Sequence, residues 1–364
     1  MFEPKYYITH NILSNIGKID AAREVIDHAA LVPSWEARFK EDAVIRTVHH
    51  GTKLEGNQLS KEQAEKLLRS GETQAELAAQ KTGVVGRDRD IQEVINYRSV
   101  LDWIEGQDLG SIKKKGYTEE ILGAIHKLTV NRILAEDQAG LYRVGQAVVV
   151  NSKTEEETFK PPPGVEVPYQ MEDFFEWLNS DEGKLHHPIL RAGVIHYELV
   201  RIHPFVDGNG RMARAMALML LSAEGYNVKR FFSLESYFDK NASSYYQALQ
   251  SVGEGEGYDL TYWLEYFTFG LSVELDQVKQ EVLKLSRDLR LKSKIGYQVA
   301  LSERQIKILE TMQNSGGRVR SNVLEKVLPA ISIDTILRDI KDLIAKGLIK
   351  KHGMTKGAYY VVVE

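Results

Sequence analysis

A glycine-rich loop that carries two arginines leads directly into the longest apolar run of the chain. The loop is HPFVDGNGRMAR, residues 203–214, and AMALMLL follows it at residues 215–221. Pro204 disfavours helix at the residue before it, while Gly208 and Gly210 allow a tight turn with exposed N–H groups. The run after the loop reads as a helix that is apolar on nearly all sides and therefore central and buried. The chain must place two guanidinium groups at the head of this helix.

The start of that helix is suited to an anion. Free N–H groups and the positive end of the helix dipole favour negative charge there. Arg211 and Arg214 are three residues apart, so they share a face, and burying both without partners would be costly. A ligand with at least two phosphates would compensate them. Asp207 would repel phosphate unless a divalent cation such as Mg²⁺ lies between them, and His203 is the natural general base.

Three other interpretations of the loop explain less. The segment GNGRMA, residues 208–213, matches a dinucleotide-binding pattern, but that pattern follows a strand. Here the apolar spacing of residues 189–202 predicts a helix before the loop. The Walker A phosphate-binding pattern is absent, because no Gly-Lys-[Ser/Thr] follows. A plain glycine turn with a solvated charged rim would leave the two arginines on an apolar helix unexplained.

The rest of the first 270 residues predicts a mainly helical protein with one hairpin. The length of 364 residues, with 43% hydrophobic residues, suffices for two or three domains. Residues 10–110 look helical, and helices resume over residues 170–202. Between them, Ala147–Val150 and Thr158–Lys160 read as a short hairpin that ends at three prolines, residues 161–163.

Composition excludes several classes of protein. Cysteine is absent, which rules out disulfides, thiolate catalysis and cysteine zinc sites. The net charge of -4 carries no global nucleic-acid signal. The start of the chain lacks a basic segment followed by an apolar run, and the run at 215–221 is far shorter than the ~20 residues of a membrane helix. We expect a soluble, cytoplasmic protein with no membrane partner.

The end of the chain reads as a separate unit. A charged helix over residues 273–300 connects to it. Ser302 and Gln305 then form a capping box that opens the first of three helices, and residues 349–363 form a hairpin. Three helices followed by a β-wing resemble a winged helix-turn-helix domain. Such a domain binds either DNA or protein, and residues 332–346 would be its recognition helix.

The loop resembles the signature of the Fic family (filamentation induced by cAMP), H-x-F-x-[D/E]-G-N-G-R-x-x-R. Every fixed position matches: His203, Phe205, Asp207, Gly208, Asn209, Gly210, Arg211 and Arg214. The hairpin resembles the flap of that family, and the likeness extends over roughly residues 1–270. The resemblance implies a mainly α protein, an all-helical Fic fold with a β-hairpin flap and a small C-terminal winged-helix domain. Its parts would be an N-terminal helical region with an inhibitory helix (1–110), a Fic catalytic core (111–272), the connecting helix (273–300) and the winged helix-turn-helix domain (301–364).

Fic proteins mostly transfer AMP from ATP to a Ser, Thr or Tyr hydroxyl of a target protein. The resemblance implies that His203 takes the hydroxyl proton and that Asp207 holds Mg²⁺ against the α- and β-phosphates. Arg211 would contact the phosphates and Arg214 would orient the β/γ end, while Phe205 packs and orients the loop. The anion nest would be formed by Gly208, Asn209 and Gly210.

Two further nucleotide contacts follow from the resemblance. The flap, about Val148–Ser152, would lie across the nucleotide through Val149, Val150 and Asn151, and an extended target segment would pair with it as an added strand. The segment KNASSYYQAL resembles the part of the family that lies behind the adenine, which points to Tyr245 and Tyr246. The alternatives are an ordinary edge hairpin and two core aromatic residues.

An upstream segment, HHGTKLEGN at residues 49–57, resembles the inhibitory motif of the family, [S/T]-x-x-x-E-[G/N]. Glu55 would then pair with Arg214 and block the productive γ-phosphate pose, so resting activity would be low and Glu55→Gly would relieve it. Gly51 stands where the motif has Ser or Thr, with Thr52 adjacent. In some relatives the equivalent glutamate also positions water to remove AMP, so a bifunctional enzyme is an alternative.

A DNA-binding transcriptional regulator with a nucleotide-sensing Fic domain is the alternative from another class. The predicted recognition helix has mixed charge, while the wing carries Lys350, Lys351, His352 and Lys356. The loop reads phosphates rather than a base, so UTP or another diphosphate-containing donor is a third option. Besides a target protein, the chain could modify itself. The sequence also leaves open a homodimer.

Overall fold

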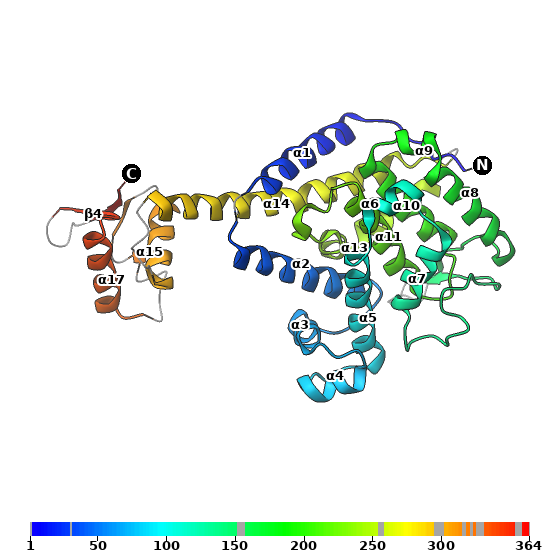
Figure 1. The fold of residues 1–364 in the computed structure, drawn as a ribbon, viewed down its shortest axis with the longest axis horizontal. Coiled ribbons are helices and arrows are strands. Elements are labelled where there is room, and N and C mark those ends of the chain that lie inside the picture. Colours follow the sequence, from blue (N-terminus) through cyan, green and yellow to red (C-terminus); the bar gives the residue numbers. More distant parts are fainter. Residues whose placement is uncertain are drawn as a thin grey trace. The chain divides into compact units, whose positions relative to one another are not determined.

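The computed structural model describes residues 2–29, 31–150, 157–253, 258–294, 302–314, 318–320, 323–324, 331–353 and 359–363. The chain divides into two compact units, Met1–Lys284 and Leu285–Glu364. Helices make up most of the first unit (Figure 1). The prediction of a mainly helical protein with a small β-hairpin is therefore confirmed.

The helices of the first unit are α1 (His10–Asp27), α2 (Pro33–Lys53), α3 (Lys61–Ser70), α4 (Ala75–Thr82), α5 (Asp88–Glu105), α6 (Leu109–Lys115), α7 (Glu119–Thr129), α8 (Val167–Asn179), α9 (Asp181–Leu185), α10 (Pro188–Ile202), α11 (Asn209–Ala223), α12 (Leu234–Lys240), α13 (Ala242–Gln250) and the greater part of α14 (Thr261–Lys294). The loop lies between α10 and α11. Short 3-10 turns lie at Gly164–Glu166, Val228–Arg230 and Ser251–Gly253.

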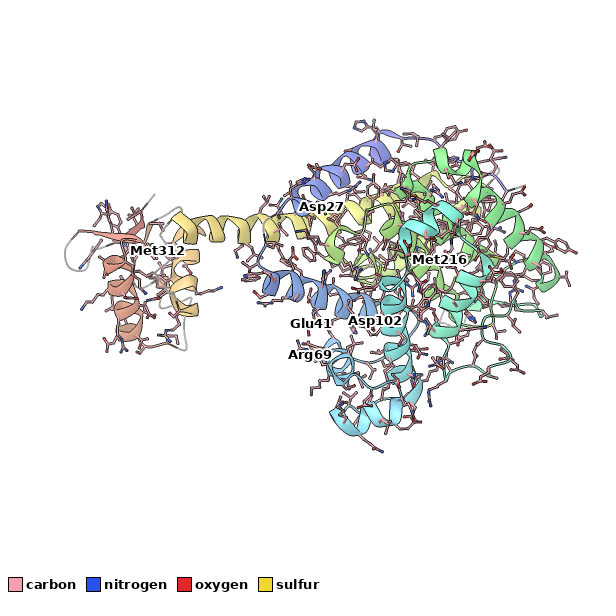
Figure 2. All side chains as sticks on the ribbon, in the orientation of Figure 1. Asp27, Glu41, Arg69, Asp102, Met216 and Met312 are labelled. Carbon is pink, nitrogen blue, oxygen red and sulfur yellow. The ribbon has the colours of Figure 1, made fainter. Side chains whose placement is uncertain are left out.

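Helix α11 is the buried helix that the sequence predicts. It packs against α10, α7, α6 and α5, and Figure 1 shows it among the other helices of the first unit. Met212, Met216 and Leu220 have no exposed surface, and the side chain of Met216 lies inside the first unit in Figure 2. Burying such side chains stabilises the fold by about 1.5–3 kcal/mol each. No helix in the described ranges is long and apolar enough to cross a membrane.

Helix α2 brings the predicted inhibitory segment to the head of α11. It packs against α5 and α12, and the segment from Leu54 to Leu59 follows its C-terminal end. Helix α3 then begins with the predicted capping box. Ser60 Oγ accepts from the backbone N–H of Gln63 at 3.2 Å, and Gln63 Oε1 accepts from the backbone N–H of Ser60 at 2.8 Å. Glu55 therefore lies in the short segment between α2 and the capped start of α3.

The predicted hairpin consists of β1 (Val149–Val150) and β2 (Glu157–Phe159), which pair antiparallel. Val149 lies opposite Phe159, and Val150 lies opposite Glu157. The second strand begins one residue earlier than the sequence predicts. Asn151, the third flap residue of the resemblance, lies outside the described residues.

The second unit contains α15 (Glu303–Asn314), α17 (Ile333–Ala345) and three antiparallel strands, β3 (Arg318–Val319), β4 (Ile349–His352) and β5 (Tyr359–Val362), in the order β3-β5-β4. Its apolar core includes Met312, which Figure 2 labels. The capping box at the start of α15 is present, because Gln305 Oε1 accepts from Ser302 N at 3.0 Å. The predicted middle helix, residues 320–329, falls largely outside the described residues, and the winged-helix assignment stays a prediction.

Candidate active site

The loop between α10 and α11 is held by its own side chains. His203 ends α10 in the left-handed region at φ 51°, and Gly208 opens α11 at φ 75°. The side chain of Asn209 accepts from the backbone N–H of Phe205 and donates to its carbonyl, both at 2.9 Å. A methyl group on Gly208 would lie 3.0 Å from the side chain of Thr129, so glycine suits both the conformation and the space.

His203 is placed as a proton acceptor. Its Nδ1 atom lies 3.2 Å from the carbonyl oxygen of Val200, which favours the tautomer with the proton on Nδ1. The lone pair is then on Nε2. Burial holds the pKa of His203 below its ordinary value, so the ring is neutral at neutral pH. A neutral imidazole with a free Nε2 can take a proton from a hydroxyl group.

Arg143 joins the loop to the base of the hairpin. Its Nε atom donates to the carbonyl of His203 at 2.7 Å, and its Nη2 atom donates to the carbonyl of Pro162 at 2.6 Å. Its backbone N–H donates to the carbonyl of Pro204 at 2.8 Å. The sequence did not predict this role of Arg143, because a single arginine before a hairpin does not indicate which groups it will bind.

His126 of α7 fixes the backbone of Asp207. Its ring stacks on Phe205 with centroids 3.7 Å apart. Gly140 N donates to Nδ1 at 2.8 Å, so Nε2 carries the proton and donates to the Asp207 carbonyl at 2.9 Å. Burial lowers the pKa of His126 to about 4, which keeps the ring neutral. This residue was also missed, because it lies in an ordinary helical pattern far from the loop in sequence.

The two arginines of the motif are buried and only partly paired. The side chain of Arg211 is 1% exposed, and its Nη2 atom lies 3.4 Å from Glu93 Oε1 and 3.6 Å from Asp207 Oδ1. Within the described ranges, Arg211 Nε and Nη1 and Arg214 Nε find no hydrogen-bond acceptor. Buried N–H groups without acceptors cost about 1–3 kcal/mol each. Guanidinium N–H groups at the head of α11 are therefore available to bind an anion.

Glu55 lies against Gly210 in the first turn of α11. Its Oε1 atom accepts from Arg214 Nη2 at 2.9 Å, and the same nitrogen donates to the carbonyl of Gly51 at 2.8 Å. A methyl group on Gly210 would collide with the Glu55 carboxylate. The structure thus brings the predicted inhibitory residue and the predicted phosphate-binding residue together, although 159 positions separate them.

The departure of Gly51 from the family pattern has a steric reason. A methyl group at Gly51 would collide with the ring of Tyr97 and lie 3.3 Å from the side chain of Glu235. Tyr97 in turn donates to Glu235 at 2.8 Å. The adjacent Thr52 does not replace the Ser or Thr of the family pattern, because its hydroxyl donates to the carbonyls of Val48 and His49 within α2.

The two tyrosines of α13 have different environments. Tyr245 is 2% exposed, and its hydroxyl lies 2.8 Å from Nε2 of the buried His196. Tyr246 is 44% exposed and donates to the carbonyl of Leu54 at 2.9 Å, directly before Glu55. Tyr246 therefore supports the segment that carries Glu55. The side chains of Val149 and Val150 are outside the described part of the structure.

Asp207 is the carboxylate of the loop that could hold a divalent metal. Its side chain is 25% exposed, and its Oδ1 atom accepts from the backbone N–H of Gly208 at 2.6 Å. The described residues contain no group of three His, Asp or Glu side chains that could hold a metal by themselves. A single carboxylate suits Mg²⁺ that takes its other ligands from phosphates and water.

The part of the chain that contains the loop between α10 and α11 is similar to known proteins. Residues 116–221 match the model of the Fic/DOC family. A protein adenylyltransferase Fic of Culex quinquefasciatus is 26% identical over 240 residues, which cover 66% of this chain and 43% of the relative. That of Drosophila willistoni is 25% identical over 242 residues, with the same two shares. The chain thus spans less than half the length of these relatives.

Two solved structures share the fold. A crystal structure of a Fic family protein from Desulfovibrio desulfuricans G20 is similar with a TM-score of 0.63 and 22% identity, covering 100% of this chain and 98% of that one. Fic-1 (residues 134–508) from C. elegans is similar with a TM-score of 0.59 and 22% identity, covering 76% of this chain and 73% of that one. Taken with the loop at the head of α11, the match over residues 116–221 identifies this part of the chain as a Fic/DOC family domain.

Proposed function

We propose that this chain is an autoinhibited protein adenylyltransferase that transfers AMP from ATP to a Ser, Thr or Tyr hydroxyl of a target protein and to itself. The observation that carries the proposal is the pair of buried arginines, Arg211 and Arg214, whose N–H groups exceed the acceptors that the described residues offer. A polyphosphate would supply those acceptors. The names of the insect relatives favour AMP transfer among the reactions of phosphates.

His203 is the general base of the proposed reaction. The target hydroxyl oxygen attacks the α-phosphorus of ATP, the bond from that phosphorus to the bridging oxygen of the β-phosphate breaks, and pyrophosphate leaves. The hydroxyl proton goes to His203 Nε2, which its neutral tautomer leaves free. Arg143 keeps the ring in place through the His203 carbonyl.

The head of α11 would bind the phosphates. The N–H groups of its first turn, at Asn209 and Gly210, have no partner within the helix and point toward its N-terminal end, while Gly208 lets the chain turn there. Arg211 and Arg214 would add charge-assisted hydrogen bonds. Asp207 would hold Mg²⁺, which when bound neutralises charge on the phosphates.

Glu55 is the proposed inhibitory residue. Its carboxylate takes the Arg214 donor that would orient the β/γ end of ATP. It also lies against Gly210, in the space where a phosphate would approach the helix. ATP would then bind productively only when the end of α2 moves or when residue 55 lacks a carboxylate. In the alternative bifunctional reading, the same carboxylate would position water for removal of AMP.

The remaining parts of the chain have proposed roles as well. The hairpin would receive an extended target segment as an added strand beside Val149, Val150 and Asn151, and Tyr245 and Tyr246 would lie behind the adenine. The organisation that we propose is an N-terminal helical region (1–110), a Fic core (111–272), a connecting helix (273–300) and a winged helix-turn-helix domain (301–364). The last of these would find the target.

The test is incubation of purified protein with α-labelled ATP and Mg²⁺. The wild type, Glu55→Gly and Glu55→Gly/His203→Ala are compared, each with cell lysate supplied as target. We expect label on protein that rises in Glu55→Gly and disappears without His203. Absence of label in every variant, with UTP and other donors tried in parallel, would refute the proposal.

A DNA-binding regulator is the second candidate, because β4 exposes Lys350, Lys351 and His352 on one short strand. A gel shift with duplex DNA that weakens with salt and is lost in Lys350→Ala/Lys351→Ala would support that function. A labelled target together with no shift would support the enzyme.

A further inference from the structure

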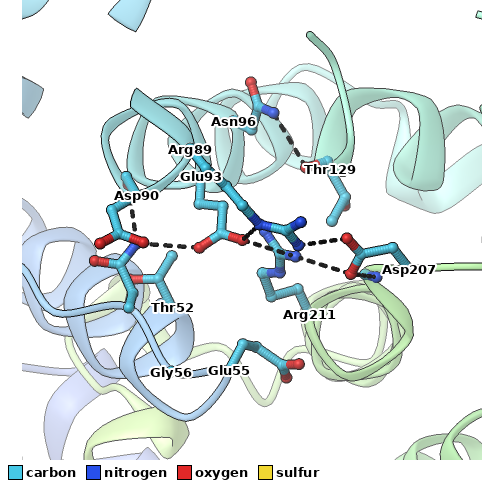
Figure 3. Close-up of polar contacts among 12 residues, drawn as sticks. Thr52, Glu55, Gly56, Arg89, Asp90, Glu93, Asn96, Thr129, Asp207 and Arg211 are labelled. Carbon is cyan, nitrogen blue, oxygen red and sulfur yellow. Dashed lines mark hydrogen bonds and ion pairs between the residues drawn. The ribbon is translucent and has the colours of Figure 1, made fainter. Parts of the chain in front are cut away.

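Arg89, a residue outside the family signature, lies against the carboxylate of Asp207. It belongs to the first turn of α5, and its Nη2 atom is 2.5 Å from Asp207 Oδ2. Its Nε atom donates to Glu93 Oε1 at 3.1 Å. Arg211 contacts the same two carboxylates, so Figure 3 shows two guanidinium groups between Glu93 and Asp207. Acidic and basic groups therefore alternate around this part of the site.

The four groups differ in how firmly they are held. Arg211 and Glu93 are 1% and 4% exposed, and Glu93 also accepts from Asn57 Nδ2 at 3.1 Å. Arg89 and Asp207 are 53% and 25% exposed. The guanidinium of Arg89 can therefore turn toward solvent without a large desolvation penalty, whereas Arg211 and Glu93 cannot.

Both oxygens of Asp207 are engaged in this arrangement. Oδ1 accepts from Gly208 N, and Oδ2 faces Arg89. A divalent cation that binds a carboxylate approaches its oxygen to about 2.0–2.1 Å in the case of Mg²⁺. A metal ion at that distance from Oδ2 and the Arg89 guanidinium, whose nitrogen is 2.5 Å from the same oxygen, would repel each other strongly. The metal and Arg89 are therefore alternative partners of Oδ2.

We propose that Arg89 is an internal cation that competes with the divalent metal for Asp207 and so determines how strongly nucleotide binding depends on that metal. The inference rests on the proposed function, because it assumes that ATP binds at this loop. Arg89 holds Asp207 when the metal is absent and releases it when the metal arrives. Glu93 retains Arg89 through Nε during the exchange, which keeps the guanidinium close enough to return.

The proposal predicts a defined change in the linkage between metal and ATP. Metal-free ATP does not require the release of Asp207, whereas Mg²⁺-ATP does. Removing Arg89 should therefore strengthen binding of Mg²⁺-ATP relative to metal-free ATP. For a half-exposed ion pair we expect the ratio of the two dissociation constants to change by about three- to tenfold.

The experiment is calorimetric titration of the full chain with ATP, once with Mg²⁺ and once with EDTA. All proteins carry His203→Ala, so that no turnover occurs, and Glu55→Gly, so that the proposed inhibitory carboxylate does not block ATP. The Kd in EDTA divided by the Kd in Mg²⁺ should rise in Arg89→Ala and stay near its starting value in Arg89→Lys, which keeps a cation beside Asp207. Arg98→Ala is the matched control, because it removes an ion pair with Asp102 from the same helix, and it should leave the ratio unchanged.

An unchanged or lower ratio in Arg89→Ala would overturn the inference, and so would an equal rise in Arg89→Lys. These outcomes are separate from failure of the proposed function. If the protein that retains Arg89 binds no ATP under either condition, the proposed function itself fails. If it binds ATP in both conditions and only the ratio is insensitive to Arg89, the role of Arg89 alone is wrong.

Discussion

Arg214 Nη2 bonds the end of α2 twice, through the Glu55 carboxylate at 2.9 Å and the Gly51 carbonyl at 2.8 Å. One guanidinium group from the buried helix α11 therefore bonds a carbonyl of α2 and the side chain of a residue just after that helix. The Arg214 side chain is 3% exposed, so it depends on these partners for compensation of its charge. The proposed inhibitory contact for this reason also contributes to stability.

Glu55→Gly should lower stability while it opens the site. Removing one partner of a fully buried ion pair costs about 3–5 kcal/mol, and we expect about 1–3 kcal/mol here because Glu55 is 28% exposed. Thermal denaturation should show a lower Tm without nucleotide and a larger increase with Mg²⁺-ATP than in wild type. Glu55→Gln, which keeps the size of the side chain, is the control for packing. Equal Tm values and equal ATP shifts in wild type and Glu55→Gly would contradict the expectation.

Gly51→Ala should displace the end of α2 and with it the proposed inhibitory residue Glu55. Its methyl group would collide with the Tyr97 ring, and Tyr97 is fully buried and bonded to Glu235, so the end of α2 must shift instead. Overpacking of this kind costs about 1–3 kcal/mol. We expect a lower Tm and more AMP transfer than in wild type.

The matched control for Gly51→Ala is Gly17→Ala in α1, where the added methyl group meets no atom within 4 Å. That change should raise stability by about 0.5–1 kcal/mol and leave activity unchanged, since alanine favours helix. If Gly51→Ala behaves like Gly17→Ala in both measurements, the tight packing under α2 has no role in inhibition.

The sequence was sufficient to predict the loop, the buried helix after it and the position of His203 at the end of a helix. Those features depend on local patterns: apolar spacing, the glycines and Pro204. The pairing of Glu55 with Arg214 came from the family resemblance, since no local pattern links residues 159 positions apart.

Other parts of the site could not be read from the sequence. Arg143 binds backbone carbonyls, His126 reaches a carbonyl 81 positions away, and Arg89 meets Asp207 across 118 positions. None of these contacts leaves a periodic trace, because each is produced by helices that pack together from distant segments. The reason for glycine at position 51 likewise appears only when Tyr97 is packed under α2.

Arg143→Ala should impair turnover more than nucleotide binding. The side chain donates to the carbonyls of His203 and Pro162, while the proposed phosphate-binding groups are on α11. In a Glu55→Gly background we expect about a tenfold or greater loss of AMP transfer, since a misplaced base costs rate. Calorimetric affinity for Mg²⁺-ATP should change less than about threefold, which is under 1 kcal/mol. A loss of affinity equal to the loss of rate would show that Arg143 supports the whole loop rather than the base.

His126 should make the protein less stable in acid. Burial lowers its folded-state pKa to about 4, whereas the unfolded chain titrates near the ordinary value of 6.5. Between these values the unfolded state binds more protons, so the free energy of unfolding falls as the pH decreases from about 6.5 to 4 and is unaffected by this group above that range. This difference between the folded-state and unfolded-state pKa corresponds to a total loss of roughly 3 kcal/mol in the free energy of unfolding. Urea unfolding at several pH values measures the slope.

His126→Phe isolates this contribution, because phenylalanine can still stack on Phe205 but cannot titrate. The variant lacks the hydrogen bonds of His126 to Gly140 and Asp207, so it should be less stable than wild type at pH 7.5. The difference in unfolding free energy between the two proteins should shrink as the pH is lowered. Other buried histidines such as His49, whose pKa is also lowered to about 4 by burial, keep part of the slope in both proteins. Parallel stability curves for the two proteins would mean that folding leaves the pKa of His126 unchanged, which would contradict its burial as a neutral ring beside Asp207.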